Sequence, residues 1–182
     1  MTDQMLIAGV GNIFLSDDGF GVEVVRHLAE LELPGWVRVA DYGISGMHLA
    51  YDLANGIHSA ILIDATPRGG TPGTVYVIEP ERPGQHVPSG SAGPTAGTAL
   101  FDAHGMQPDV VFGMLDMLGA QTGRVLIVGC EPARADYGIG LSAPVAAAVD
   151  EAVRVVLGLV AAHEREATGA DGVNEAQPGE DQ

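Results

Sequence analysis

Lysine is absent from this chain, whose eight basic residues are all arginine and stand against 24 aspartates and glutamates. The resulting formal net charge of -16 argues against nucleic acids and anionic membranes as partners, because both would be repelled. Such a charge suits a partner with a basic segment, although acidity also serves solubility alone. We therefore expect no nucleic acid and no membrane insertion.

Cysteine is almost absent as well. The single Cys130 excludes a disulfide within the chain and is typical of a protein in a reducing cytosol. A basic region leading into an apolar run with a cleavage site is also lacking at the start, so we expect no signal peptide. The most apolar helix, near residues 143–162, contains Asp150, Glu151 and Arg154, which argues against a membrane span. These features predict a cytoplasmic protein, and we expect a monomer.

The length of 182 residues and the 46% hydrophobic content predict one globular domain. We place this domain at residues 1–165. Residues 166–182 contain five acids, no base and no apolar pattern, and we expect them to be a disordered acidic tail.

Apolar strand patterns alternate with helical ones over the first third of the chain, which predicts parallel pairing. The connection over residues 66–73 is too short for a crossover helix, so the strand after it should run back along the edge. The predicted fold is a three-layer α/β sandwich, with a five-stranded, mostly parallel twisted sheet, one antiparallel edge strand and helices on both faces. Strands are expected at residues 5–10, 36–43, 60–65, 74–80 and 124–131.

Acidic residues follow three of these strands. Asp17 and Asp18 come after the first, Asp41 ends the second, and Asp64 ends the third. Parallel strands place these acids at one edge of the sheet, where open α/β folds bind ligands. Taken alone, Ser16, Asp17 or Asp18 would more often simply cap the following helix. A dinucleotide site is rejected, because its third glycine should stand where Phe14 is found.

Asp18, Asp64 and His104 form a candidate metal site. Two carboxylates and an imidazole suit a divalent ion such as nickel or zinc, with positions left open for a substrate. The three residues are scattered, so their spacing does not establish the site, and capping acids and a loop histidine remain the common alternative. Cys130 is a rival nucleophile, although lone cysteines of this kind are usually buried and inert.

Several motifs together resemble the hydrogenase maturation peptidases. They are GVGN with SDDGFG at residues 9–21, DYGISGMHL at 41–49, LIDAT at 62–66, PGTV at 72–75, HGMQPDVVF at 104–112, VGCEP at 128–132 and GIGLSAPV at 138–145. The resemblance extends from about residue 5 to residue 162, with the motifs in the family's order.

The resemblance implies that Asp18, Asp64 and His104 are the metal ligands, with Asp17 as an alternative to Asp18. It further implies substrate contacts at Asp41, Gly43, Gly46 and Asp17. For Asp41, a positioning role and ordinary turn chemistry stay open as alternatives.

The implied activity is that of an endopeptidase, in a family grouped with aspartic-type enzymes. Such an enzyme removes the C-terminal extension of a nickel–iron hydrogenase large-subunit precursor after nickel insertion. The nickel is carried by cysteines of the precursor, and zinc or cadmium could take its place in vitro. A non-catalytic nickel-binding chaperone or sensor in hydrogenase assembly would use the same residues and stays open as an alternative.

Overall fold

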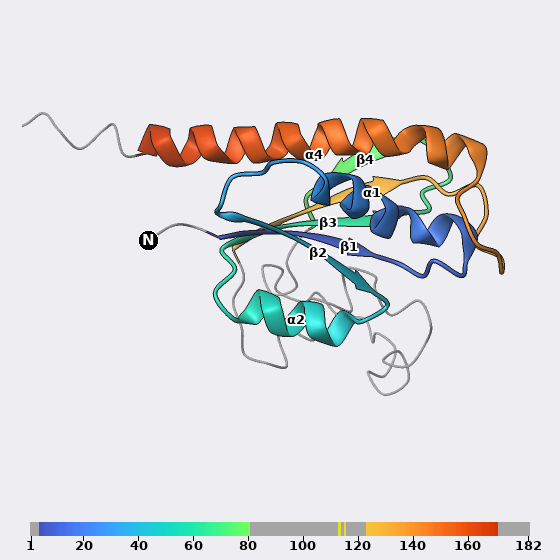
Figure 1. The fold of residues 1–182 in the computed structure, drawn as a ribbon, viewed down its shortest axis with the longest axis horizontal. Coiled ribbons are helices and arrows are strands. Elements are labelled where there is room, and N and C mark those ends of the chain that lie inside the picture. Colours follow the sequence, from blue (N-terminus) through green and yellow to red (C-terminus); the bar gives the residue numbers. More distant parts are fainter. Residues whose placement is uncertain (1–3, 81–112, 114, 116–122, 171–182) are drawn as a thin grey trace, which may run out of the picture.

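A computed structural model of the chain describes residues 4–80, 113, 115 and 123–170. Within these residues the structure is a sheet covered by helices on both faces (Figure 1). Strand β1 (Met5–Val10) is buried along its whole length and lies inside the sheet. An uninterrupted apolar run of this kind is typical of a parallel strand with both faces covered.

The sheet has five strands in the order β2-β1-β3-β5-β4. Strand β1 pairs in parallel with β2 (Val37–Gly43) and β3 (Ser59–Ala65), and β3 pairs in parallel with β5 (Arg124–Cys130). Strand β4 (Val75–Ile78) runs antiparallel to β5 at the edge. The predicted fold class, including its single antiparallel edge strand, is confirmed.

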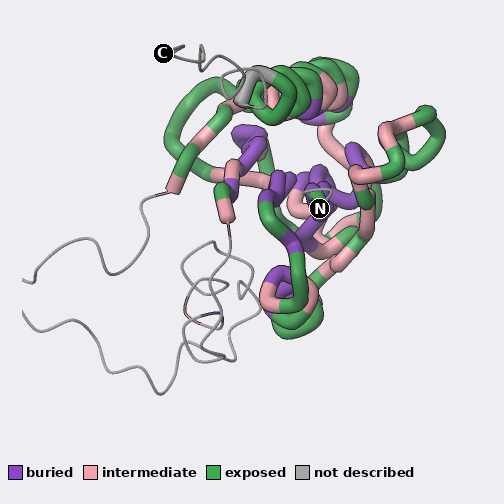
Figure 2. Tube along the Cα trace, turned by 90° about the vertical axis from the view of Figure 1, so that its left-hand side faces the viewer, coloured by how far each residue is buried: buried purple, intermediate pink, exposed green. Residues whose placement is uncertain are grey.

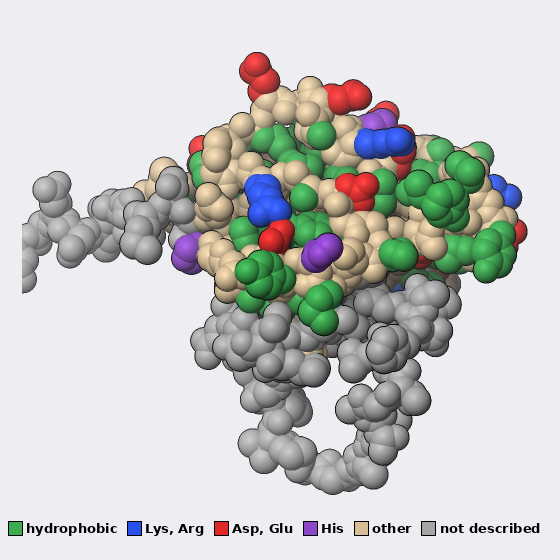
Figure 3. Space-filling view, turned by 60° about the horizontal axis from the view of Figure 1, so that its bottom comes forward, with side chains coloured by type: hydrophobic (Ala, Val, Ile, Leu, Met, Phe, Trp, Pro, Cys, Tyr) green, Lys and Arg blue, Asp and Glu red, His purple; other side chains and the backbone are tan. Residues whose placement is uncertain are grey.

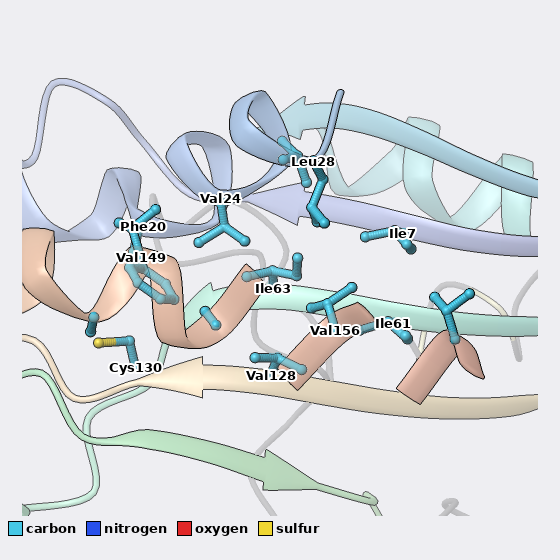
Figure 4. Close-up of a cluster of buried hydrophobic side chains, with 14 of the residues drawn as sticks. Ile7, Phe20, Val24, Leu28, Ile61, Ile63, Val128, Cys130, Val149 and Val156 are labelled. Atoms are coloured by element: carbon cyan, nitrogen blue, oxygen red, sulfur yellow. The ribbon is translucent and has the colours of Figure 1, made fainter. Parts of the chain in front are cut away.

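Helices α1 (Phe20–Ala29) and α4 (Ala143–Ala170) lie on one face of the sheet, and α2 (Gly46–Ala54) lies on the other (Figure 1). Two buried clusters result, one on each face. Phe20, Val24 and Leu28 of α1 meet Ile61 and Ile63 of β3 in the first cluster, beneath α4 (Figure 4). The tube view shows buried residues concentrated in the sheet and exposed ones on the outward sides of the helices (Figure 2).

The start of α1 is pressed against the sheet through glycines. A Cβ atom at Gly21 would overlap the carbonyl oxygens of Ile63 and Val10, and one at Gly9 would overlap the carbonyl oxygen of Gly21. Neither position has room for a side chain. This close packing holds the loop between β1 and α1 down on the ends of the strands.

The expected limits of β2, β3, β4 and β5 differ from the observed ones by one or two residues, and two expectations about helix ends also differ from the structure. The acids before α1 do not cap it, because Ser16–Gly19 forms a separate 3-10 helix, η1, and the N-cap of α1 is Gly19, without a side-chain cap bond. The helix α4 also continues to Ala170, past the expected domain end at residue 165. No proline intervenes there, and the Thr168 hydroxyl donates to the carbonyl oxygen of Glu164 one turn earlier. The rest of the expected tail, residues 171–182, lies outside the described residues.

His104 also lies outside the described residues. Leu115 is buried and belongs to the cluster on the α2 face. Among the described helices, none is long and apolar enough to cross a membrane.

The glycine contacts predict unequal effects of two alanine substitutions. Gly21→Ala should lower the free energy of unfolding by about 1–3 kcal/mol, because the new methyl group overlaps backbone atoms of the sheet. Gly158→Ala in α4 meets no atom within 4 Å and should stabilise the protein by about 0.5–1 kcal/mol through helix propensity. Urea denaturation of both variants tests this, and equal effects of the two changes would contradict the packing described here.

Candidate functional site

The acids that follow β1 and end β3 lie at the topological switch point of the sheet, where the strand order reverses. Strand β1 is flanked by β2 on one side and by β3 on the other. The connection after β1 therefore leads to one neighbour, and the connection after β2 leads to the neighbour on the opposite side of β1. Open α/β sheets bind ligands in the crevice outside the carboxyl ends of the strands at such a switch point. Asp18 comes from the connection after β1, and Asp64 from the end of β3.

Asp18 is fixed by the glycine turn that precedes it. Its Oδ2 accepts a hydrogen bond of 2.7 Å from the backbone N–H of Asn12. Gly11 has a φ of 121°, and a Cβ there would overlap the carbonyl oxygen of Asp18 and lie 3.7 Å from Oδ1 of Asp64. Only glycine can therefore occupy this position, at which the backbone runs between the two acids.

Asp64 is partly buried beside Asp18. Burial, together with the Asp18 carboxylate, raises the pKa of Asp64 to about 8 against the lowering effect of a hydrogen bond from the backbone of Ala65. Two ionised carboxylates that are close together and shielded from water repel each other, unless one of them is protonated or a cation binds between them. The donor set therefore fits a divalent cation with oxygen or mixed ligands.

Asp64 points to the same face of the sheet as α2. Side chains alternate along a strand, and Leu62 of β3 belongs to the α2-side cluster while Ile63 belongs to the opposite one. Leu115 is buried in that same α2-side cluster, on the face toward which Asp64 points. His104 itself lies outside the described residues, and within the described part of the chain no three His, Cys, Asp or Glu residues are grouped closely enough to hold a metal ion.

Asp17 has a different environment from its neighbour. It is completely buried, and its two oxygens accept hydrogen bonds from the backbone N–H groups of Ala133, Arg134 and Ser142 and from the Ser142 hydroxyl. Burial raises the pKa of Asp17, but the bonds from Ser142, Arg134 and Ala133 outweigh it and hold the pKa below the ordinary value. The structure thus gives Asp17 an internal role instead of the expected substrate contact, and it favours Asp18 over Asp17 as a ligand.

Asp41, Gly43 and Gly46, the other expected substrate contacts, lie in and after β2. The exposed Asp41 accepts a hydrogen bond of 2.8 Å from the N–H of Gly43 through its Oδ1. Gly43 has a φ of 51°, and its carbonyl oxygen accepts a hydrogen bond of 2.9 Å from the N–H of Gly11. This bond joins the turns after β1 and β2. Gly46 is buried as the first residue of α2. Of these three residues, only Asp41 presents an exposed side chain.

Glu131, which the sequence did not single out, organises the loop after Asp64. This carboxylate is buried and accepts hydrogen bonds from the backbone N–H groups of Arg68 and Gly69 and from the hydroxyl of Tyr76. Burial raises the pKa of Glu131, while these bonds lower it below its ordinary value overall. No local pattern could have revealed this role, because the donors lie more than 50 residues earlier in the chain.

Cys130 is poorly suited to act as a nucleophile. Its thiol is fully buried in the cluster beneath α4 (Figure 4). Burial and the carboxylates of Asp17, Glu131 and Glu151 raise its pKa to about 11, so the reactive thiolate is disfavoured at neutral pH. The expectation that Cys130 is buried agrees with the structure.

These observations define the class of the protein: an open α/β domain with a pair of adjacent carboxylates at its switch point and no exposed thiol nucleophile among its described residues. The model of the hydrogenase maturation protease family matches residues 22–159. The chain belongs to this family.

Individual relatives agree with the family match. A protein of Methanocaldococcus jannaschii named as a hydrogenase maturation protease is 34% identical over 159 residues, which cover 85% of this chain and 95% of the relative. The hydrogenase 2 maturation protease of Escherichia coli is 30% identical, over 85% of this chain and 88% of its own. The solved structure of the hydrogenase maturating endopeptidase HybD from E. coli superposes with a TM-score of 0.66 at 27% identity, covering 88% of this chain and 93% of that one.

The two adjacent aspartates should differ in their effect on stability. Asp17→Asn replaces an acceptor oxygen by an amide that cannot accept, and it should lower the free energy of unfolding by about 1–3 kcal/mol because buried donors lose their partner. Asp18→Asn keeps one oxygen for the Asn12 N–H and should change stability much less. Equilibrium denaturation at neutral pH compares them; equal losses would contradict the separate roles.

Asp64→Asn should stabilise the metal-free protein increasingly as the pH rises from about 4 to about 8. The pKa of Asp64 is raised in the folded state, so the folded protein binds more protons than the unfolded chain over this range and loses stability as the pH increases. Asparagine removes that loss. Denaturation curves in the presence of a chelator at pH 5 and pH 9 measure the difference between wild type and variant, and a difference that is larger at pH 5 would contradict it.

Proposed function

We propose that this protein is an endopeptidase that removes the C-terminal extension of a nickel–iron hydrogenase large-subunit precursor once nickel has been inserted. Membership of the hydrogenase maturation protease family supports the reaction and the partner. The observation that supports recognition of the metal is the pair formed by Asp18 and Asp64. Burial, together with the Asp18 carboxylate, raises the pKa of Asp64, and a cation would relieve the repulsion between the two acids.

In this proposal the nickel belongs to the substrate. Thiolates of the precursor hold the ion, and Asp18, Asp64 and His104 complete its coordination with harder ligands. Asp64 is held by the end of β3, and Asp18 is held by the glycine turn after β1. Because both carboxylates are fixed in this way, the ion would fix the position of the precursor relative to the enzyme. A precursor without nickel would lack this attachment, so occupancy of the metal site would be converted into specificity of cleavage.

The chemistry of cleavage needs a polarised carbonyl or an activated water, and a divalent ion can supply either. The protein supplies orientation. Asp18 accepts the Asn12 N–H through one oxygen, which leaves its other oxygen available to a ligand. The grouping with aspartic-type enzymes, the use of zinc or cadmium in place of nickel, the cytoplasmic location and the monomeric state belong to the same proposal.

Cleavage of a purified precursor tests this function. Wild-type protein should shorten the nickel-loaded precursor and leave the nickel-free precursor intact. Asp64→Asn and His104→Ala should reduce cleavage below detection without unfolding the protein, whereas Cys130→Ala should retain it. Gel mobility and mass spectrometry of the precursor measure the products, and circular dichroism checks the fold.

Glu79→Gln is a matched control, because Glu79 is an exposed carboxylate on the edge of the sheet that pairs only with Arg124 among the ion pairs found in the described part of the chain. It should cleave as wild type does. Full cleavage by both site variants would refute the site assignment. Tight binding of nickel-loaded precursor without any cleavage would refute the peptidase and support a nickel-binding chaperone.

A further inference from the structure

A groove of about 590 Å³ opens on the face of the sheet opposite the side chain of Asp64. It lies between α1 and the first turns of α4, and it is closed at one end by η1 and by the loop before α4. None of the expected site residues except Asp41 lines it. Its long sides are lined by Val22, Glu23 and Arg26 of α1 and by Ala146, Val149 and Asp150 of α4.

The groove combines an apolar floor with an acidic rim. Aliphatic side chains of α1, α4 and the loop between β5 and α4 form the floor, including those of Val22, Leu141 and Val149. Three carboxylates, those of Glu23, Asp41 and Asp150, stand against one guanidinium, that of Arg26. This composition matches an occupant with one large apolar side chain and one cationic side chain.

The carboxylates of the rim are not equally engaged. Arg26 already donates to Glu23 at 2.9 Å. The side chain of Asp150 is 87% exposed, and its Oδ1 makes a long contact of 3.9 Å with Nδ1 of His27. Asp150 is therefore more available to a cation from a partner than Glu23 is.

A single short helix separates the groove from the acid pair. Ser16 and Gly19 of η1 line the groove, while Asp18 of the same helix binds the Asn12 N–H beside Asp64. Ile13 connects the two, since it lines the groove and directly follows Asn12. A chain bound in the groove would therefore continue over η1 toward the carboxylates.

The groove is preformed at this end. The backbones of Ser16 and Gly138 are joined by a hydrogen bond of 2.8 Å, and Gly138 in turn donates to Phe14 at 3.0 Å. The Ser16 hydroxyl donates to the carbonyl oxygen of Asp136, and the buried Asp17 binds the same loop further along. A surface held by so many internal bonds loses little conformational entropy when a partner binds.

Large apolar side chains stand exposed on these two joined loops. Phe14 is 59% exposed, Tyr137 91% and Ile139 82%. Hydrophobic side chains gather visibly at the end of the molecule that carries the carboxyl ends of the strands (Figure 3, right). Exposed aromatic and aliphatic residues that continue a groove mark a surface for protein association.

We propose that this groove binds an extended segment of the precursor polypeptide next to the bond that is cleaved, with its apolar side chain on the floor and its cationic side chain at Asp150. The inference rests on the proposed function and deepens it, because it assigns recognition of the polypeptide to one side of η1 and recognition of the metal to the other. The acidity of the chain makes a cationic segment of a partner more favourable here than a second copy of the same protein.

Filling the groove tests the proposal. Ala146 is exposed and lines the groove, whereas the exposed Ala147 does not line it. Ala146→Trp should raise the KM for nickel-loaded precursor about tenfold and leave kcat within about twofold, because binding is lost equally from the ground state and the transition state. Ala147→Trp should behave as wild type, and it carries the same cost in helix propensity.

Reversing the charge tests the cationic contact. Asp150→Lys should raise KM by a similar factor and should remove most of the salt dependence of KM between 50 and 300 mM sodium chloride. Glu151→Lys changes the net charge equally at an exposed residue outside the groove, and it should keep both the KM and the salt dependence.

The outcomes separate this inference from the proposed function. Wild-type KM in both groove variants, with cleavage intact, would overturn the groove as a binding site and leave the peptidase in place. Absence of cleavage by wild-type protein would overturn both. Sedimentation velocity provides the remaining test, since a wild-type dimer that Ala146→Trp dissociates would show that a second copy occupies the groove and would also overturn the proposal.

Discussion

The buried Asp17 carboxylate joins parts of the chain that lie more than 115 residues apart. Its four hydrogen bonds hold the loop between β5 and α4 against the short helix that follows β1. Burying a carboxylate is costly unless its oxygens are fully hydrogen-bonded, and here backbone donors supply nearly all of the bonds. Asp18, the groove and the exposed apolar loops all depend on this connection, because each is built from one or both of the joined segments.

Two adjacent carboxylates thus perform different tasks. Asp17 is satisfied inside the protein and has a lowered pKa, whereas Asp18 lies beside Asp64, whose pKa burial and the Asp18 charge raise to about 8. The first arrangement stabilises the fold, and the second stores electrostatic repulsion at the switch point of the sheet. A protein keeps such repulsion where a ligand relieves it, which is why perturbed carboxylates indicate functional sites.

The fold could be predicted from the sequence to a large extent. Continuous apolar strands such as Met5–Val10, alternating with helical patterns, predict a parallel sheet, and the short connection before Val75–Ile78 predicts an antiparallel edge strand. Acids at the ends of the first and third strands could also be predicted to share one edge. Helix limits were less accessible, since η1 and the extension of α4 to Ala170 depend on local bonds that composition does not reveal.

The sequence by itself determined the fold class, the family and the candidate acids, because strand and helix periodicity, connection length and short motifs are local properties of the chain. Only the tertiary structure distinguished the buried, hydrogen-bonded Asp17 from its neighbour Asp18, joined Glu131 to the loop after Asp64, and formed the groove between α1 and α4. Each of these depends on contacts between residues far apart in the chain. The hydrogen bonds and the burial that distinguish two neighbouring aspartates exist only after the chain has folded.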